Sequence, residues 1–366
     1  MNKRDLTIIK IGSNTLIDGD KTIRQSLIDE ILSLVSRRIQ NGEKIIIISS
    51  GAVALGRAAL HDDKRVLSKA VVAGVGQVNL IAGYFESAKK LNLLISDLLI
   101  TRPHLVDHEQ FLKLQETVAG LLGNNIIPIV NENDALVSGS DWAFGDNDSL
   151  AASLAIAFGA RRLIILSHVD GLYDGDPAKD PQAKFIPEVK DANAMIMKFC
   201  SKDTSALGSG GMVSKLKAAR LCAAVGIETR IVNGLLGGAL DRALNDESIG
   251  TVFIPLPAAQ AIKNRDRWIL SAKSSAGSIM IDDGAEAALC RGKSLLAVGV
   301  KKVYGSFDQK EIVELVNGKK EGIAFGIVDV SSKNLEKVLK SDKTGVQVMH
   351  ADNIMIYHGV CVISKK

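Results

Sequence analysis

The first 255 residues alternate two hydrophobic patterns: short apolar runs rich in β-branched residues, and longer segments rich in Ala and Leu. Apolar strands that alternate with helices indicate a mostly parallel sheet covered on both faces, because parallel strands need crossover connections. Strands are predicted at residues 6–11, 44–48, 126–130, 163–166 and 228–232, with weaker candidates at 94–100 and 251–254. Helices are predicted at 26–40, 52–60, 69–90, 109–124, 149–158 and 214–225.

The pattern changes after Pro255-Leu256-Pro257, which ends the last of these strands. Beyond it, short strand-like runs are separated by turns of Gly, Asp and Lys, which is typical of a small β-rich barrel. These runs cover residues 268–270, 278–281, 295–298, 303–304, 312–316, 322–328 and 353–356. We therefore predict an α/β domain over residues 1–255, a linker over 256–264 and a β-rich domain over 265–366.

Composition changes this picture little. The chain has 366 residues, of which 46% are hydrophobic and 23% charged, as expected for two ordinary globular domains. The net charge of +4 lies entirely in residues 265–366, which hold 16 Lys and Arg against 12 Asp and Glu. This mild excess permits an anionic partner of the C-terminal part without requiring one.

The four cysteines, Cys200, Cys222, Cys290 and Cys361, form no Cys-x-x-Cys pair and have no His at metal-ligand spacing. We expect them to be reduced thiols of a cytoplasmic protein. The N-terminal residues lack the apolar length of a signal peptide, and no stretch reaches 18 uninterrupted apolar residues. Neither secretion nor a membrane span is expected.

Candidate chemistry lies where the predicted strands end, because ligands of open parallel sheets bind beyond the carboxyl ends of the strands. The first strand ends in Lys10-Ile11-Gly12, and a lysine within an apolar strand is costly unless it meets an anion. The alternative interpretation of Lys10 is a lysine at the edge of the sheet whose amine reaches solvent. The second strand leads through Ser50-Gly51 into a helix, which suits either an anion site or an ordinary N-terminal cap.

The third strand end and the segment before the next Ala-rich helix are both polar. Asn131-Glu132-Asn133-Asp134 caps a turn or holds the ammonium of an amino acid substrate. Gly145-Asp146-Asn147-Asp148-Ser149 is either a helix cap or an acidic cluster that orients Lys10, Lys215 or Mg²⁺ among phosphates. The segment lacks the spacing of a calcium-binding loop. A magnesium ion that keeps its waters and is coordinated by ATP oxygens is the metal that fits this acidic cluster. A further strand ends in Ser167-His168, where a turn-rich loop suits the edge of a nucleotide base or an ordinary loop histidine.

The strongest signal is Gly208-Ser209-Gly210-Gly211-Met212-Val213-Ser214-Lys215 before an Ala-rich helix. Three glycines let successive backbone N–H groups line an anion site, and Ser214 is a candidate helix cap. Lys215 then falls in the first helical turn, where it can contact a phosphoryl group. The alternative is a flexible glycine loop. The loop does not have the Walker A spacing, and no dinucleotide-binding Gly-x-Gly-x-x-Gly motif follows a predicted strand.

Together these elements favour a kinase. Two lysines far apart in sequence can contact one phosphoryl group from opposite sides, and phosphoryl transfer needs mainly alignment and charge neutralisation. A carboxylate acceptor is already a nucleophile at pH 7 and needs no general base, and no convincing base or Ser-His-Asp order is found. We therefore expect an ATP-dependent kinase of a small acidic metabolite.

These motifs, in this order, resemble the amino acid kinase family. The pair Asn131-Glu132-Asn133-Asp134 and Gly145-Asp146-Asn147-Asp148 is most similar to members that phosphorylate the side-chain carboxylate of L-glutamate, the first step of proline biosynthesis. Carried over by position, the resemblance implies Lys10, Lys215 and Asp148 as catalytic residues, with Asp148 organising the lysines. It implies glutamate contacts from Ser50, Asp134 and Asn147. It implies ATP contacts from Lys10, Ser167, His168, Ser209, Gly210, Gly211, Met212, Val213, Ser214 and Lys215, with Mg²⁺ carried on ATP and no metal ligands from the protein.

Two positions depart from that family pattern. The family often has Thr-Asp where Ser167-His168 stands, so the contacts at the nucleotide edge differ. It often has a basic residue two positions before Gly145, where this chain has Ala143, so a contact to the glutamate carboxylate is missing.

Residues 282–285, 292–296 and 303–307 resemble the PUA domain, an RNA-binding module. The PUA resemblance leaves RNA as a possible partner, and the resemblance to the amino acid kinase family implies a homo-oligomer inhibited by proline. Two alternatives stay open: a sister kinase that acts on aspartate or N-acetylglutamate, and an RNA-binding protein on an inactive kinase scaffold. The C-terminal region lacks an Arg-rich stripe with interleaved aromatics, which disfavours the second.

Overall fold

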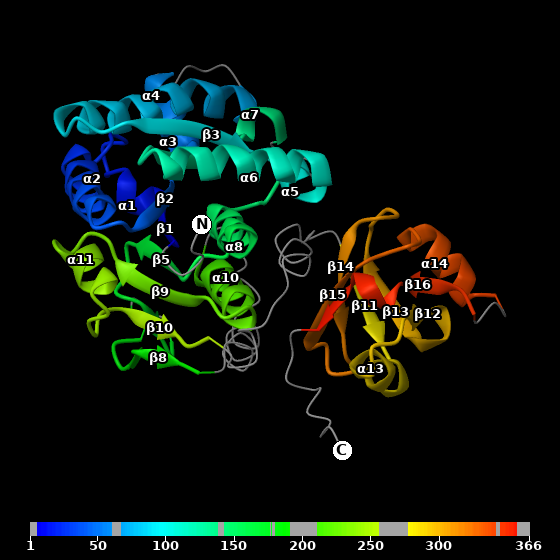
Figure 1. Cartoon of the computed structure of the whole chain (residues 1–366). Coiled ribbons are helices and arrows are strands. Elements are labelled where there is room, and N and C mark those ends of the chain that lie inside the picture. The colour runs from blue at the N-terminus through cyan, green and yellow to red at the C-terminus, as the bar shows by residue number, and fades with distance from the viewer. Residues whose placement is uncertain are drawn as a thin grey trace. The chain divides into compact units, whose positions relative to one another are not determined.

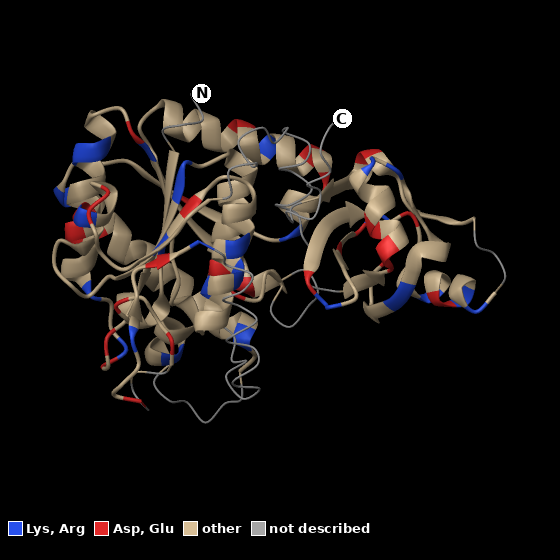
Figure 2. Ribbon diagram, turned by 90° about the horizontal axis from the view of Figure 1, so that it is seen from below, with Lys and Arg blue, Asp and Glu red and all other residues tan. Residues whose placement is uncertain are grey.

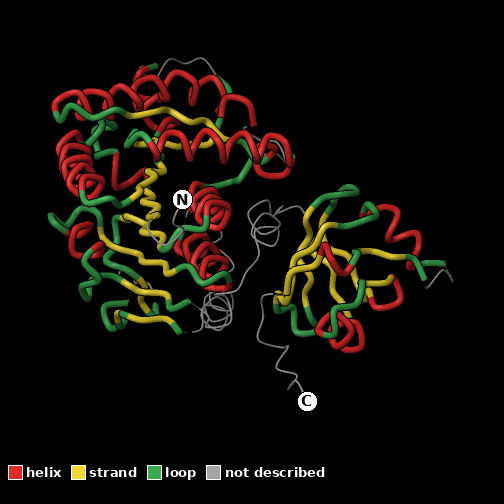
Figure 3. The backbone as a smooth tube through the Cα atoms, in the orientation of Figure 1, coloured by secondary structure: helices red, strands yellow, loops and turns green. Residues whose placement is uncertain are grey.

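The computed structural model describes residues 6–60, 67–137, 143–175, 177, 180–190, 211–255, 277–341 and 345–356. The chain divides into two compact units, Met1–Pro257 and Ala258–Lys366. Figure 3 shows that helices dominate the first unit and strands the second. The linker predicted at 256–264 lies outside the described residues, so the domain limits drawn from the sequence stay predictions.

An eight-stranded sheet forms the centre of the first unit (Figure 1). Its order is β3 (Ile95–Ile100), β4 (Ile127–Glu132), β2 (Lys44–Ile48), β1 (Leu6–Ile11), β5 (Arg162–Ser167), β9 (Glu228–Asn233), β10 (Thr251–Phe253) and β8 (Glu188–Val189). Every neighbouring pair from β3 to β9 is parallel, and only β10 runs against β9. The predicted mostly parallel sheet is therefore confirmed, and β1 and β2 have the predicted bounds.

Helices cover both faces of this sheet, as the alternating pattern predicts. In Figure 1, α2 (Gln25–Gln40) and α11 (Ala239–Leu244) lie on one side of β1 and β5, and α8 (Asn147–Phe158) and α10 (Met212–Ala224) on the other. Around β3 and β4, α4 (Lys69–Lys90) and α6 (His108–Gly123) flank opposite faces. The remaining elements of the unit are α1 (Ser13–Leu16), α3 (Ala52–Ala59), α5 (Pro103–Val106), α7 (Asp134–Val137), β6 (Leu172–Tyr173) and β7 (Phe185–Ile186).

The face of the sheet that α2 covers forms one apolar core with that helix. Ile9, Ile47 and Ile164 of the central strands pack with Ile31 and Val35 of α2, and all five are essentially inaccessible. On the other face, α8 is buried nearly throughout because Ala and Leu occupy its whole circumference. Burial on both sides holds β1 and the start of α8 in fixed relative positions, which matters for the site below.

Helices α3 and α4 approach each other closely because both carry glycine at the contact. A Cβ atom built on Gly76 would lie 1.7 Å from the carbonyl oxygen of Ala52, and one on Gly56 would lie 1.9 Å from that of Val72. Such distances exclude any side chain without a shift of the backbone. The two glycines therefore set the distance between α4 and the turn in which β2 ends.

The second unit has a core of its own. A five-stranded sheet is ordered β13 (Val300–Gly305), β11 (Gly277–Ile281), β14 (Ile312–Val316), β15 (Gly322–Ile327) and β17 (Ile354–Ile356). A smaller sheet pairs β12 (Leu295–Leu296) with β16 (Gln347–Met349). The unit also contains two helices that the sequence analysis did not predict, α13 (Asp283–Cys290) and α14 (Ser332–Leu339), and two 3₁₀ turns, η2 (Ala297–Gly299) and η3 (Ala351–Asn353). The strand run predicted at 268–270 lies outside the described residues.

The cysteines differ in part from expectation. Cys222 is a buried free thiol, whereas Cys290 is disulfide-bonded, so the prediction of reduced thiols is wrong for Cys290. The spacing of cysteines along the chain does not report their distances in the fold, on which a disulfide depends. Among the described helices, none is both long and apolar enough to cross a bilayer.

The glycine contact gives a testable prediction. We expect Gly76→Ala to lower the free energy of unfolding by roughly 1–3 kcal/mol, because the methyl group has no space against Ala52. The matched control is Gly74→Ala on the same helix, where an added Cβ meets nothing within 4 Å. This control should gain about 0.5–1 kcal/mol from the better helix propensity of Ala. Urea denaturation followed by circular dichroism measures both, and an equal effect at the two positions would contradict the packing argument.

Candidate active site

One buried carboxylate lies between two buried ammonium groups. Asp148 Oδ1 is 2.8 Å from Lys10 Nζ, and Asp148 Oδ2 is 3.1 Å from Lys215 Nζ. The hydroxyl of Ser214 also donates to Asp148 Oδ2 at 2.7 Å. The structure thus brings together the three residues to which the family resemblance assigned catalytic roles, from β1, α8 and α10.

Local sequence accounts for these positions. Asp146 caps α8, since its carboxylate accepts from the backbone N–H of Ser149 at 2.7 Å, and Asp148 then lies in the first turn. Helix α10 begins at Met212 with Gly211 as its N-terminal cap, so the prediction of Ser214 as the cap is wrong. Ser214 lies inside the helix, where its single hydroxyl hydrogen has two possible acceptors at 2.7 Å, Asp148 Oδ2 and the carbonyl oxygen of Gly211. Lys215 is in the first turn, as predicted.

The three charges shift one another. Burial, opposed by the carboxylate of Asp148 and reinforced by the ammonium of Lys215, leaves the pKa of Lys10 below its ordinary value of 10.5. Burial alone would raise the pKa of Asp148, but Lys10 and Lys215 together outweigh it and lower that pKa. Taken alone, Lys10, Lys215 and Asp148 carry one excess positive charge, which the carboxylate of Asp146 offsets in part from further away. A buried excess of positive charge favours an anion beside it.

A hydrogen-bonded group of small polar residues lies beside these charges. The amide of Asn147 donates to the carbonyl of Ser49, the hydroxyl of Ser50 and the side-chain oxygen of Asn131, at 2.9, 2.9 and 3.0 Å. Gly51 follows in the left-handed region, with φ +110°, and begins α3. Glycine adopts this conformation without strain, which allows the tight turn from β2 into α3.

Acidic residues and one lysine form the end of the site away from Lys10. Asp134, the first residue of α7, is 3.0 Å from Lys69 Nζ, and Lys69 is the first residue of α4. Burial raises the pKa of Glu132, and the negative charge of Asp134 raises it further. A hydrogen bond from the backbone N–H of Phe144 offsets part of this rise. Lys69 is not among the site residues predicted from the sequence. A lysine at a helix N-terminus is electrostatically unfavourable, which is a signal that it is placed there for another reason.

Ala143, one of the departures from the family pattern, has a neighbouring cation. The guanidinium of Arg102 donates to the carbonyl of Ala143 at 3.1 and 3.3 Å and lies 5.0 Å from the ring centre of Phe144. Arg102 is buried and is not among the residues that line the pocket. It holds the backbone before Gly145 and does not replace a basic side chain in the pocket.

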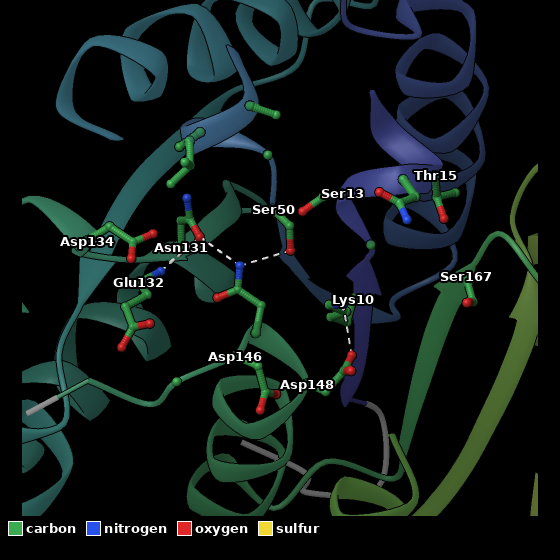
Figure 4. Close-up of a pocket in the computed structure, with 18 of the residues that line it drawn as sticks. Lys10, Ser13, Thr15, Ser50, Asn131, Glu132, Asp134, Asp146, Asp148 and Ser167 are labelled. Carbon is green, nitrogen blue, oxygen red and sulfur yellow. Dashed lines mark hydrogen bonds and ion pairs between the residues drawn. The ribbon is translucent and has the colours of Figure 1, made fainter. Parts of the chain in front are cut away.

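A pocket of about 330 Å³ joins these groups (Figure 4). Asp134, Glu132 and Asn131 lie at one end, Lys10 and Asp148 at the centre, and Ser167 on the far side. The predicted site residues that line this pocket are Lys10, Ser50, Asp134, Asn147, Asp148, Ser167, His168 and Lys215. Gly211, Met212 and Val213 form the start of α10, half-buried, while Ser209 and Gly210 lie outside the described residues.

Within the described ranges, no group of three or more His, Cys, Asp or Glu side chains is arranged to hold a metal ion. Both oxygens of Asp148 are engaged by Lys10, Lys215 and Ser214, and both oxygens of Asp146 by Ser149.

Comparisons with known proteins agree with this geometry. Residues 5–233 match the amino acid kinase family and residues 277–350 match the PUA domain. The chain is 36% identical over 363 residues to a glutamate 5-kinase of Vibrio parahaemolyticus, with 95% of each chain covered. It is 36% identical over 337 residues to one of Pelagibacter ubique, covering 91% of this chain and 90% of the other. A crystal structure of UMP kinase from Bacillus anthracis, 14% identical with a TM-score of 0.50, covers 70% of this chain and 97% of its own, and supports the fold alone.

The chain therefore belongs to the amino acid kinase family and carries a PUA domain in its C-terminal part. The curated relatives named above, similar over nearly the whole chain, are glutamate 5-kinases. The family resemblance drawn from the motifs is confirmed.

The lowered pKa of Lys10 gives a pH prediction. As pH rises, Lys10 loses its proton at a value below 10.5, and a neutral amine no longer attracts phosphate. We expect kcat/KM for ATP, which reports the free enzyme, to decline on the alkaline side below pH 10.5. Lys10→Arg should lower the rate and move this decline upward, because guanidinium stays charged. Circular dichroism at each pH controls for unfolding, and a flat profile to pH 10.5 would contradict the assignment.

Proposed function

We propose that the protein transfers the γ-phosphoryl group of ATP to the side-chain carboxylate of L-glutamate, giving L-glutamyl 5-phosphate and ADP, the first step of proline biosynthesis. The observation that carries this proposal is the buried pair of lysines held by Asp148 beside a pocket lined with polar residues. The match over 95% of the chain to glutamate 5-kinases supports glutamate as the acceptor.

The lysines act on charge. Lys10 and Lys215 attract the phosphates of ATP and neutralise charge on the transferring group, and Asp148 keeps their ammonium groups apart and oriented. The first turns of α8 and α10 both lie at this point, and their N-terminal dipoles add to the attraction. We assign the remaining ATP contacts to Ser167, His168 and residues 209–214. Mg²⁺ bound to ATP would add positive charge beside the phosphates, next to that of Lys10 and Lys215.

The acceptor needs positioning more than activation. A glutamate side chain is ionised at neutral pH, so its oxygen attacks the γ-phosphorus directly while the bond to the ADP oxygen breaks. We assign the binding of glutamate to Ser50, Asn147 and Asp134. The hydrogen bonds of Asn147 to Ser50 and Asn131 hold this end of the pocket rigid before the substrate arrives.

Two features of the partners are also proposals. The exposed apolar residues Val71, Val75, Val78 and Phe85 recur along one face of α4, which supports self-association into a homo-oligomer. Proline as a feedback inhibitor and a cytoplasmic location rest on the proposed pathway alone.

RNA binding through the PUA domain is a second proposal, motivated by the family match at residues 277–350. Figure 2 shows basic and acidic positions interspersed over this unit, without a single basic stripe. A purely RNA-binding role does not account for the Lys10–Asp148–Lys215 group. Salt-dependent RNA binding without kinase activity would favour that role over ours.

The direct test traps the product. With ATP, Mg²⁺ and hydroxylamine, we expect a hydroxamate to form from L-glutamate, because the acyl phosphate reacts with hydroxylamine. Aspartate, N-acetylglutamate and UMP, each with and without proline, complete the panel. Product from aspartate or N-acetylglutamate in place of glutamate would assign the enzyme to a sister activity.

A second prediction concerns Lys215. We expect Lys215→Ala to lower kcat by roughly 10²–10³-fold, the usual cost of losing one group that stabilises transition-state charge. Lys217→Ala is the matched control, since Lys217 is exposed on the same helix. Steady-state rates measure both, and circular dichroism verifies folding. Turnover within a few-fold of the parent would remove Lys215 from the proposed machinery.

A further inference from the structure

Lys69 occupies a position that neither the family pattern nor the sequence analysis assigned to a function. It is the first residue of α4, directly after the cap Ser68, and its ammonium lines the pocket. A positive charge there opposes the helix dipole, so the helix itself gains nothing from it. Its one ion pair in the described structure is with Asp134, at 3.0 Å.

The charges of the pocket divide between its two ends. At the phosphoryl end, Lys10 and Lys215 share Asp148. At the acceptor end lie two carboxylates, Glu132 and Asp134, which Figure 4 shows on the side away from Lys10. Among the residues that line the described pocket, Lys69 is the cation at this acceptor end.

The ion pair between Lys69 and Asp134 is suited to exchange. The side chain of Lys69 is 55% exposed and that of Asp134 is 18% exposed, so water screens their attraction. A pair of this kind contributes little to stability, and opening it costs correspondingly little. A ligand that brings one positive and one negative group can therefore replace the direct pair with two new ones.

We propose that Lys69 binds the α-carboxylate of the substrate while Asp134 binds its α-ammonium group, so that this pair selects a free α-amino acid. The inference rests on the proposed function and extends it from the reacting carboxylate to the other end of the substrate. It also accounts for the alanine at position 143: the cation that the family pattern often has there is supplied by Lys69 from another element.

The test compares L-glutamate with 4-aminobutyrate, which keeps the amine and the reacting carboxylate but lacks the α-carboxylate. In Lys69→Met we expect the preference for glutamate, as a ratio of kcat/KM values, to fall about tenfold to a hundredfold, the usual effect of losing a charged hydrogen bond. Any change in how Asp134 binds the amine affects both substrates and cancels in the ratio. KM for ATP should stay within about twofold, because Lys69 is remote from the phosphoryl end.

Two variants control this test. Lys69→Arg keeps the charge and should restore most of the preference. Lys90→Met removes a lysine from the far end of the same helix, where Lys90 pairs with Asp29 at 3.1 Å and is similarly exposed, and it should leave both substrates unchanged.

Each outcome decides the matter. An equal loss on both substrates would assign Lys69 a structural role and overturn the inference, and so would an unchanged preference. If turnover of 4-aminobutyrate is below detection, a rise of tenfold or more in KM for glutamate, with kcat within about threefold and rescue by Lys69→Arg, supports the inference; without that split it fails. Failure of the parent protein to phosphorylate glutamate would instead overturn the proposed function itself.

Discussion

The site depends on one carboxylate buried between two ammonium groups. Removing three charges from water is costly, and the attraction among Asp148, Lys10 and Lys215 compensates only when all three are in place. They come from a central strand and from the first turns of two helices, so the sheet and its helical layer must both be complete before the group forms. The net positive charge of these three residues, which Asp146 offsets in part from further away, makes the centre of the pocket suited to phosphate.

The acceptor end is built by a different means. Glycine contacts draw α3 and α4 together, and Gly51 turns the chain from β2 into α3. Helix α4 begins at the pocket with Lys69, and Gln77 of this helix accepts a hydrogen bond from Asn131 at 3.0 Å. Asn131 in turn accepts a hydrogen bond from Asn147. Close packing of small residues thus positions the side-chain amides at the acceptor end, whereas ion pairs with Asp148 position Lys10 and Lys215 at the phosphoryl end.

The two units have separate apolar cores, and the chemistry described above lies wholly in the first. The PUA domain adds a strand-rich module with a small excess of basic residues and no part in the pocket described here. The mild excess of basic residues in this part of the chain permits an anionic ligand without specifying one.

The sequence alone determined the mostly parallel sheet and all of its strands except β8, and it proposed the lysines of the phosphoryl end. Continuous apolar runs such as residues 45–48 are strong strand signals because a strand buried on both faces has few polar positions. Strand β4 exceeded its prediction only where the polar Asn131 and Glu132 continue the strand. Lys10 and Lys215 could be found because a lysine in a buried strand and one after a glycine loop each have few structural explanations. The tertiary structure decided what depends on distance across the chain. It decided that Ser214 bonds to Asp148 instead of capping its helix, that Cys290 is bonded, and that Lys69 meets Asp134. Local patterns report which face of an element is apolar, but only packing decides which polar side chains from different elements come within a few ångströms of one another.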